Sequence, residues 1–282
     1  MLFRSATRMG SPALPLAIIS GGSSGIGLAC AVELAKLGHR LALIARDEGR
    51  LHRAAQDLRA AGATVETMAV DVGDAEASTS AVDLLVERFG PPSWLITSAG
   101  IAEPGLFLEQ PLGAHEAQMQ TNYFGSLYLA HAAARHMAKA GGGRIVFVSS
   151  GAGLYGIHGY AAYGPSKFAV RGLAEVLRVE LAGHGISVTV AYPPDTRTPQ
   201  LEAEERTKPE ATKRITAGGG LWEADAVARK IVAGAQAGRF MVTPGLPTVA
   251  LAALHSLLGP ILRARQVRLV RETKDGDRVA PD

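Results

Sequence analysis

The stretch Ser20-Gly21-Gly22-Ser23-Ser24-Gly25-Ile26-Gly27 follows a short apolar run and leads directly into a segment with helical periodicity. Gly21 permits a tight turn, Gly25 removes the Cβ atom where a pyrophosphate approaches the backbone, and Gly27 lets the helix pack closely on its strand. Free N–H groups at the start of that helix favour phosphate oxygens. Because the cluster lies between the first strand and the first helix of a βαβ unit, it predicts a dinucleotide site rather than a plain turn.

Apolar runs typical of strands alternate with longer helical segments along the rest of the chain. The predicted strands are Leu16–Ser20, Arg40–Ala45, Thr64–Val70, Ser93–Thr97, Arg144–Ser149, Ile186–Tyr192 and Phe240–Thr243. The predicted helices are Gly25–Leu37, Glu48–Ala61, Ala75–Phe89, Gly113–Ala138, Ala161–Ala182 and Glu223–Ala237. Several strands are apolar almost throughout, as strands covered on both faces are. This alternation predicts an α/β domain with a parallel sheet and right-handed crossovers.

Composition limits the class of protein. The chain has 282 residues, of which 47% are hydrophobic and 20% charged, so it can bury a large core and is not a disordered chain. A single cysteine, Cys30, excludes a disulfide framework and a cysteine-based zinc cluster, and we expect no metal site. The net charge of +3 and 5% aromatic residues argue against a nucleic-acid partner. We expect a loose extension over 1–14, a domain over 15–245 with a lid over 194–222, and an apolar then basic segment over 246–282.

Tyr163 and Lys167 lie four residues apart at the start of a predicted helix, so they share one face of it. A free tyrosine has a pKa of about 10 and is a poor acid at neutral pH, but a nearby ammonium group lowers that pKa. We therefore expect Tyr163 to donate a proton to a carbonyl oxygen as hydride arrives from a nicotinamide. The strand before this helix ends in Ser149 and Ser150, at the edge of the sheet where open α/β folds bind ligands.

The residues after the second strand bear on the choice of dinucleotide. An NAD site needs a carboxylate there for the ribose 2′-OH, whereas an NADP site needs cations for the 2′-phosphate. Asp47 could serve the first purpose, but it is also suited to cap the next helix. Arg46 and Arg50 are four apart and share a face at the start of that helix. We expect NADPH as the cofactor, with a solvated surface as the alternative role of the two arginines.

The glycine pattern, with Ser20 in place of the usual Thr, and the Tyr163-x-x-x-Lys167 motif resemble the short-chain dehydrogenase/reductase family. The resemblance covers about Leu16 to Thr243. It implies a single-domain Rossmann fold, that is, a doubly wound parallel seven-stranded sheet with helices on both faces, and a nicotinamide cofactor. It also implies a homodimer or homotetramer that pairs through the fourth and fifth long helices.

The same resemblance implies roles for particular residues. Ser150 precedes Tyr163 by 13 residues, the spacing of the family's carbonyl-binding serine, and Ser149 is the alternative. Asn122 matches the asparagine that holds a water linking the lysine to solvent, and Asp71 matches an adenine-contacting aspartate, with a turn carboxylate as the alternative. The expected catalytic residues are Asn122, Ser150, Tyr163 and Lys167. The expected cofactor-binding residues are Gly21, Ser23, Ser24, Gly25, Ile26, Gly27, Arg46, Arg50, Asp71, Val72, Ala99, Gly100, Tyr163, Lys167, Pro193, Thr196 and Thr198.

A narrower resemblance concerns the substrate. Residues 191–199, 205–210, 159–163 and 168–175 resemble a branch of the family that uses NADPH to reduce the 3-keto group of long-chain sphingoid bases. The expected lid carries four carboxylates that suit the cationic amine of such a substrate; a solvated, charged lid is the alternative. They are Asp195, Glu202, Glu204 and Glu205.

The sequence is also compatible with two other functions. A reductase of the same family that acts on 3-oxoacyl thioesters, steroids or other ketones would keep the same catalytic residues. A non-catalytic nucleotide-sensing protein could lose the tyrosine or the lysine, so the intact set of Ser150, Tyr163 and Lys167 argues against it.

The C-terminal segment suggests a membrane contact. Residues 246–262 contain no Asp, Glu, Lys or Arg, and four arginines follow by residue 271. This stretch is short for a spanning helix, which needs about 20 residues, and Pro247, His255, Gly259 and Pro260 weaken that interpretation further. We expect an interfacial or re-entrant hairpin over 246–271, drawn to anionic headgroups, on an otherwise cytoplasmic enzyme. A helix that covers the core edge, or a dimer contact, is the alternative.

Overall fold

The computed structural model describes residues 14–273, so the predicted extension over 1–14 and the end of the chain after 273 lie almost wholly outside it. Within these residues a seven-stranded parallel sheet has the order β3-β2-β1-β4-β5-β6-β9. Its strands are β1 (Leu16–Ser20), β2 (Arg40–Ala45), β3 (Val65–Ala69), β4 (Pro92–Thr97), β5 (Gly143–Val148), β6 (Ile186–Ala191) and β9 (Met241–Val242). The chain reverses its winding direction between β1 and β4, as in a doubly wound sheet. This confirms the predicted fold.

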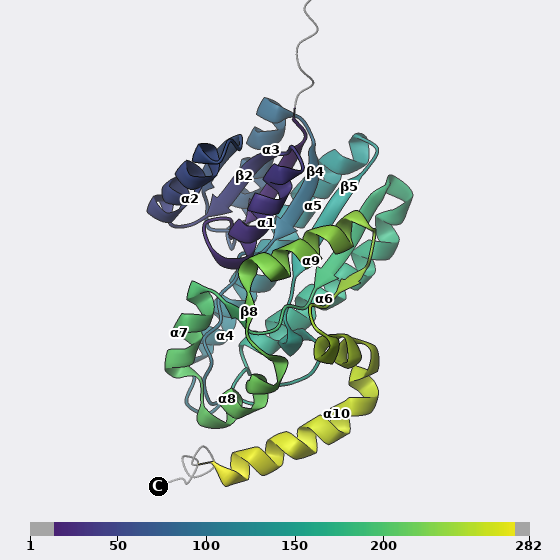
Figure 1. Cartoon of the computed structure of the whole chain (residues 1–282). Coiled ribbons are helices and arrows are strands. Elements are labelled where there is room, and N and C mark those ends of the chain that lie inside the picture. The colour runs from purple at the N-terminus through teal and green to yellow at the C-terminus, as the bar shows by residue number, and fades with distance from the viewer. Residues whose placement is uncertain (1–13, 274–282) are drawn as a thin grey trace, which may run out of the picture.

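Helices cover both faces of the sheet (Figure 1). They are α1 (Gly25–Lys36), α2 (Glu48–Ala60), α3 (Ala75–Phe89), α4 (Leu112–Met119), α5 (Gly125–Lys139), α6 (Tyr163–Glu180) and α9 (Ala224–Gln236). One core cluster joins α1, α2 and α9 to the sheet, and a second joins α3, α5 and α6 to its other face. The ends of the predicted strands and helices differ from these by at most two residues, apart from the split of the fourth helix. Asp47 and Asp74 cap α2 and α3, because their side chains accept the Arg50 and Ala77 N–H groups.

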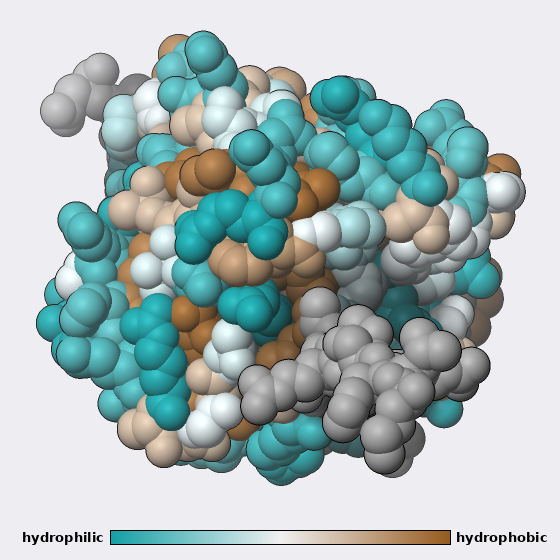
Figure 2. All heavy atoms as spheres, turned by 90° about the horizontal axis from the view of Figure 1, so that it is seen from above, coloured by the Kyte–Doolittle hydropathy of each residue, from teal (hydrophilic) through white to brown (hydrophobic). Residues whose placement is uncertain are grey.

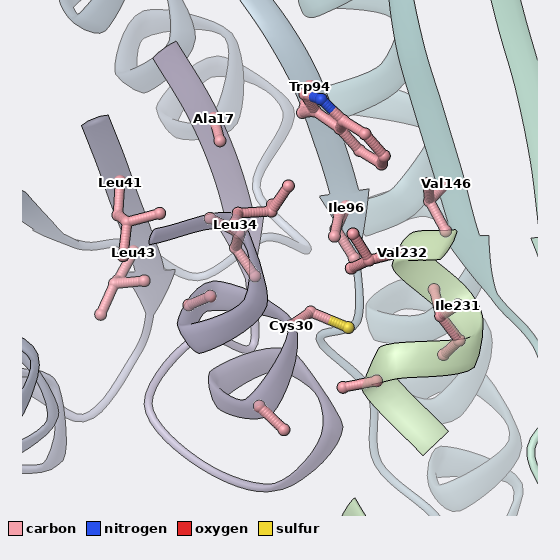
Figure 3. Packing of buried hydrophobic residues seen from close by; sticks show 14 of the residues in the cluster. Ala17, Cys30, Leu34, Leu41, Leu43, Trp94, Ile96, Val146, Ile231 and Val232 are labelled. Atoms are coloured by element: carbon pink, nitrogen blue, oxygen red, sulfur yellow. The ribbon is translucent and has the colours of Figure 1, made fainter. Parts of the chain in front are cut away.

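The first core cluster explains the role of the single cysteine. Figure 3 shows Cys30 of α1 in the space between β4 and α9, near Ile96 and Ile231. All three side chains are fully buried. Burial raises the pKa of the Cys30 thiol to about 12, so the group stays protonated and packs as a small hydrophobic side chain.

The predicted helix Gly113–Ala138 is divided in the structure. Between α4 and α5 the chain forms a π-helical turn, Gln120–Phe124. A Cβ atom on Gly125 would lie 2.6 Å from Val72 Cγ2, so α5 can approach the loop after β3 only because that residue is glycine. The wider turn brings Asn122, fully buried, to the inner side of the helix, and π-helical turns of this kind often occur at functional sites.

The predicted excursion over one end of the sheet forms a small separate layer. It contains α7 (Pro199–Thr207) and α8 (Glu210–Thr216), and its two ends are joined by the parallel strands β7 (Thr196–Arg197) and β8 (Trp222–Glu223). Figure 1 shows α7 and α8 together at the end of the molecule that also carries α10. We call residues 194–222 the lid. The opposite end of the molecule, which Figure 2 shows from above, is mostly hydrophilic, with apolar residues gathered near its middle.

The C-terminal segment is a helix, α10 (Leu246–Glu272), and the predicted hairpin is wrong. Pro260 is inside this helix, and Figure 1 shows that α10 bends along its length. A proline removes one backbone hydrogen bond and crowds the preceding turn, which kinks a helix without reversing the chain. In the part of the chain that the structure describes, no helix is both long and apolar enough to cross a membrane.

Candidate active site

A cavity of about 970 Å³ opens at the carboxyl end of the sheet. Its lining comes from the turn between β1 and α1, the ends of β2, β4 and β5, the start of α6, the lid and α10. It therefore lies where the strand order reverses, at the position where open α/β sheets bind their ligands.

The glycine turn forms a cradle at one end of this cavity. Gly21 and Gly25 have φ angles of +66° and +55°, which glycine adopts without strain. A Cβ atom on Gly25 would lie 3.0 Å from Thr198 Cγ2, and one on Gly27 would clash with the Gly21 carbonyl. Ser24 does not cap α1 with its side chain, so the first N–H groups of the helix are open to a phosphate.

Other residues complete this cradle and fit a pyrophosphate. Ser23, Ser24 and Ile26 line the cavity, whereas Gly27 lies behind it and packs against the turn. Ser20, in the position of the usual threonine, accepts the N–H groups of Ser98 and Ala99, each at 3.2 Å. This pair of hydrogen bonds ties the end of β1 to the loop after β4, where Ala99 and Gly100 line the cavity.

Arg46 and Arg50 both line the far end of the same cavity. The Arg46 Nη1 lies 3.7 Å from the Asp71 carboxylate, and the Arg50 Nε lies 3.2 Å from the Asp47 carboxylate. All four side chains are more than half exposed, so these ion pairs contribute little to stability and the arginines can turn toward a ligand. Asp47 caps α2, which is the alternative role predicted for it.

Asp71 is held by a local turn. Its carboxylate accepts the Gly73 N–H at 2.9 Å, and the residue is not among those that line the cavity, whereas its neighbour Val72 is. The structure thus places Asp71 as a turn carboxylate beside Arg46, and the predicted contact to adenine stays a prediction.

Tyr163 and Lys167 lie together at the start of α6, and Ser150 faces them from the loop just after β5. Tyr163 is 7% exposed and Lys167 is 6% exposed, and both line the cavity. The Lys167 Nζ lies 5.6 Å from the centre of the Tyr163 ring and donates to the Val148 carbonyl at 3.1 Å. Ser149 points elsewhere, because its hydroxyl donates to the Lys167 carbonyl at 3.0 Å. The geometry therefore favours Ser150 over Ser149 as the carbonyl-binding serine.

The pKa of Tyr163 is shifted upward, whereas the sequence led us to expect a lowered pKa. Burial raises it above its usual value, the negative charge of Glu204 raises it further, and the hydrogen bond with Ser150 only partly opposes them. Burial also lowers the pKa of Lys167 to about 8. The expected lowering of the Tyr163 pKa by Lys167 is overridden, because desolvation opposes the charged form of both groups. A raised pKa keeps the Tyr163 phenol protonated, which is the form that a proton donor needs.

Asn122 braces the loop beside these groups. Its Oδ1 accepts the Ile101 N–H at 2.8 Å, and its Nδ2 donates to the Ile101 carbonyl and to the Ser166 hydroxyl, both at 2.9 Å. It is fully buried and does not line the cavity. A Cβ atom on Gly100 would lie 3.1 Å from Asn122 Oδ1 and 3.5 Å from Lys167 Nζ, so Asn122 is close to Lys167. Its predicted role in holding a water stays a prediction.

The residues after β6 close the cavity on the lid side. Pro193, Thr196 and Thr198 all line it, and their predicted contact with the cofactor stays a prediction. The Thr196 hydroxyl donates to the Pro194 carbonyl at 2.7 Å, and the Thr198 hydroxyl accepts the Leu201 N–H at 3.2 Å and caps α7. These bonds set the direction in which the lid leaves the sheet.

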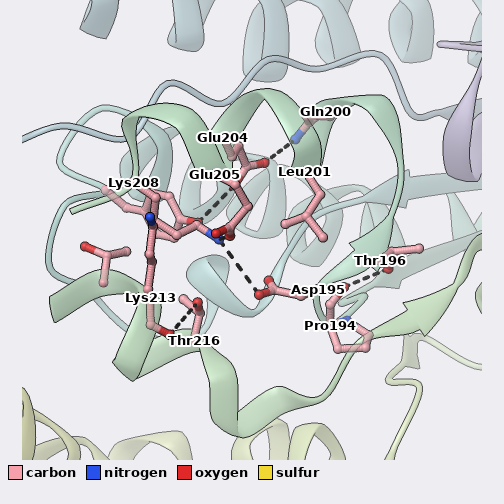
Figure 4. A network of polar contacts seen from close by, with 12 residues as sticks. Pro194, Asp195, Thr196, Gln200, Leu201, Glu204, Glu205, Lys208, Lys213 and Thr216 are labelled. Atoms are coloured by element: carbon pink, nitrogen blue, oxygen red, sulfur yellow. Dashed lines mark hydrogen bonds and ion pairs between the residues drawn. The ribbon is translucent and has the colours of Figure 1, made fainter. Parts of the chain in front are cut away.

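The lid carboxylates have different surroundings. Figure 4 shows the Lys208 ammonium between two of them: it lies 2.6 Å from Glu205 and 3.9 Å from Asp195, and its side chain is fully buried. Glu202 is exposed, and Glu204 is buried. Lys208 thus partly balances the charges of Asp195 and Glu205, and it ties α7 to the loop before β7.

The residues predicted from the sequence to form the site include none from α10, although this helix contributes to the cavity. Leu251, Leu258, Leu262 and Arg265 line the cavity, and their spacing along the helix puts them on one face. Gln266 fixes this helix to the loop before Tyr163, because its side chain accepts the His158 N–H at 2.8 Å and donates to the Gly156 carbonyl at 2.9 Å. The helical spacing of the leucines was the available signal.

Comparison with known proteins identifies the family. The family model for short chain dehydrogenase matches residues 15–209, so the chain belongs to the short-chain dehydrogenase family. The 3-dehydrosphinganine reductase of Danio rerio is 39% identical over 249 residues, which cover 86% of this chain and 75% of that protein.

Solved structures agree with this assignment. A short-chain dehydrogenase/reductase from Burkholderia phymatum in complex with NAD superposes with a TM-score of 0.78 at 27% identity, covering 89% of this chain and 95% of that one. A short-chain dehydrogenase from Sphingobium yanoikuyae in complex with NADPH gives a TM-score of 0.75 at 30% identity, with 86% and 93% covered.

Proposed function

We propose that the protein is an NADPH-dependent reductase that converts the 3-keto group of a long-chain sphingoid base to the 3-hydroxyl. One observation carries the proposal: a cavity joins a phosphate cradle, the Ser150, Tyr163 and Lys167 side chains, and an apolar wall of leucines from α10. A dinucleotide would bind at the phosphate cradle. The keto group of the lipid would lie at the Ser150, Tyr163 and Lys167 side chains, and its apolar chain would lie along the leucines. The name of the Danio rerio relative points to the same substrate.

The residues divide the reaction between them. The Ser150 hydroxyl holds the substrate carbonyl oxygen, and Tyr163 donates its proton to that oxygen as the C=O bond is reduced. Lys167, with its charge beside the phenol, stabilises the phenolate that remains. The glycine cradle and Thr198 would hold the pyrophosphate side of NADPH, and Arg46 and Arg50 its 2′-phosphate. NADPH supplies the hydride that the ketone carbon receives.

The substrate is tested by NADPH consumption with 3-ketodihydrosphingosine beside a 3-oxoacyl thioester and a steroid ketone. We expect kcat/KM to be highest for the sphingoid base. A higher value for the thioester or the steroid would support another reductase of the family, and no consumption with any ketone would support a nucleotide-sensing protein.

Removing both arginines at the adenosine end should change the cofactor preference. In Arg46→Ala/Arg50→Ala we expect the Kd for NADPH to rise by about 10–100-fold and that for NADH to change little, because only NADPH carries the 2′-phosphate that a guanidinium pairs with. Fluorescence titration with each cofactor measures both values. Arg53→Ala, on the same helix and outside the cavity lining, is the control. Equal losses for both cofactors would point to Asp47 and an NAD enzyme.

We also propose that α10 docks on a membrane surface. Its exposed face carries Leu254, Leu257 and Ile261, which are 46%, 74% and 67% exposed, while its other face lines the cavity. The arginines 263, 265, 268 and 271 follow on the same helix and are exposed, which suits anionic headgroups. A peripheral contact of this kind would put the cavity beside a substrate that resides in the membrane.

Charges on this exposed face should abolish the membrane contact. We expect the full chain to float with liposomes that contain phosphatidylserine, and Leu257→Glu/Ile261→Glu to remain in the unbound fraction, because a buried charge cancels the gain from apolar insertion. Leu84→Glu, on α3, is the control. A chain truncated after Gly245 tests the whole segment. If wild type and variants float equally, or none floats, the membrane contact is wrong.

A second copy of the chain is the proposed protein partner. Phe168, Val176 and Val179 of α6 are 41%, 53% and 77% exposed, and apolar side chains of this size on one helix suit a homodimer or homotetramer contact. The predicted cytoplasmic location stays a prediction.

A further inference from the structure

Glu204 is a buried carboxylate in the cavity that contains the reacting groups. It is 7% exposed and lines the same cavity as Tyr163 and Lys167. Its two oxygens accept hydrogen bonds from the Tyr160 hydroxyl at 2.9 Å and from the Gln200 Nε2 at 3.0 Å. Both donors are neutral. Among the side chains that the structure describes, no Lys, Arg or His nitrogen forms an ion pair with this carboxylate within 4.0 Å.

An ionised carboxylate in this position is costly for the fold. Burial raises the pKa of Glu204, although the hydrogen bonds from Gln200 and Tyr160 and the charge of Lys208 act in the opposite direction. A buried charge is stable only when a counter-charge or strong hydrogen bonds replace the lost water. The lid pairs Lys208 directly with Asp195 and Glu205, so the charge of Lys208 acts on Glu204 only from beyond ion-pair distance. A cation from a ligand that enters the cavity would therefore stabilise the charged form of this carboxylate.

Glu204 is also close to the proton donor. The ring of Tyr160, which holds Glu204, lies 5.3 Å from the ring of Tyr163, centre to centre. The charge of Glu204 acts on both groups: it adds to the burial that raises the pKa of Tyr163, and it partly opposes the burial that lowers the pKa of Lys167. A cation that pairs with Glu204 would thus lie next to a ketone that is bound at Tyr163.

We infer that Glu204 binds the protonated amine of the substrate and determines the preference of the enzyme for amino ketones. In a 3-keto sphingoid base the amine is on the carbon adjacent to the keto carbon, so an ammonium group stands beside the carbonyl that Tyr163 protonates. The charge-assisted hydrogen bond would replace the missing counter-charge. This inference rests on the proposed function and names the residue that recognises its substrate.

The test compares 3-ketodihydrosphingosine with its N-acetyl derivative, which is neutral at the same position. Glu204→Gln keeps the shape of the side chain and an acceptor for Tyr160 but removes the charge. We expect kcat/KM for the free base to fall by about 10–100-fold, and that for the N-acetyl derivative to change by less than about threefold, since a hydrogen bond between charged groups is lost only with the first. The Kd for dihydrosphingosine, the cationic product, should rise by a similar factor.

Two further measurements separate recognition from a structural role. The Tm of Glu204→Gln should equal or exceed that of wild type, because an unpaired buried charge has been removed, whereas a structural carboxylate would lower the Tm when lost. Glu210→Gln removes an exposed carboxylate of the same lid, which pairs with Arg214, and should leave the kcat/KM of both substrates unaffected.

The outcomes are distinct. Equal losses for the free base and the N-acetyl derivative, or full activity of Glu204→Gln with the free base, would overturn this inference and leave the proposed function standing. If wild type does not reduce the free base, the proposed function and this inference both fail.

Discussion

Tyr163→Phe should abolish ketone reduction and leave NADPH binding nearly intact. A positioned general acid contributes about 10²–10⁴-fold to the rate, and the phenylalanine variant cannot donate the proton. The side chain is buried at the start of α6, and its aromatic ring packs against Tyr160, so the substitution keeps the packing. The phosphate cradle and the two arginines lie at other parts of the cavity and are unchanged.

Steady-state turnover and a fluorescence titration with NADPH measure the two properties separately. Tyr128→Phe, which removes a phenol from α5 outside the cavity lining, controls for the loss of a hydroxyl. If Tyr163→Phe keeps more than about a tenth of the wild-type kcat, Tyr163 is not the general acid. A large loss of NADPH binding would instead show that the phenol mainly positions the cofactor.

The fold was predictable because its signals are local and repeated. Each strand is an apolar run, each helix has a continuous periodic face, and the cluster around Gly25 fixes the first βα turn. The π-helical turn at Asn122 was not predictable, because it depends on the approach of Gly125 to Val72, two residues that are far apart in the sequence. The sequence of Gly113–Ala138 shows one continuous helical periodicity and gives no sign of this tertiary contact.

The C-terminal helix shows a different limit. Pro260 indicated a break in the segment, but a proline can kink a helix as well as end it, and packing decides between the two. The contacts of Gln266 with the loop at Gly156 and His158 hold α10 against the site, and these partners are more than 100 residues away in the chain. The sequence does not reveal these contacts, so the apolar segment looks like a tail that is separate from the domain.

The candidate site was predictable in its residues but not in its electrostatics. Ser150, Tyr163 and Lys167 meet in the cavity, as the motif spacing indicates. The motif does not contain Glu204, whose carboxylate raises the pKa of Tyr163. Nor does the motif indicate how deeply these side chains are buried. Burial raises the pKa of Tyr163 and lowers the pKa of Lys167, so it favours the neutral form of each group.

Those directions lead to an expected pH dependence. The pKa of Lys167 is lowered to about 8, so its ammonium form is complete only below that pH and is lost as the pH rises through it. The pKa of Tyr163 is raised, so the phenol stays protonated across the same range. If the Lys167 charge stabilises the phenolate that forms during reduction, the wild-type kcat should fall above about pH 8.

Lys167→Met should lower kcat by about 10²–10³-fold, the loss typical when one group that stabilises developing charge is removed. Because methionine cannot titrate, the decrease in kcat above about pH 8 should also disappear, and the profile from pH 6.5 to 9 should be flat. Kinetics over this range for wild type, Lys167→Met and Lys139→Met, an exposed lysine of α5, measure both effects. If Lys167→Met keeps the decrease above pH 8, another group titrates there and the assignment of the Lys167 charge is wrong. A flat profile combined with wild-type kcat would show that the ammonium group does not stabilise the phenolate at all.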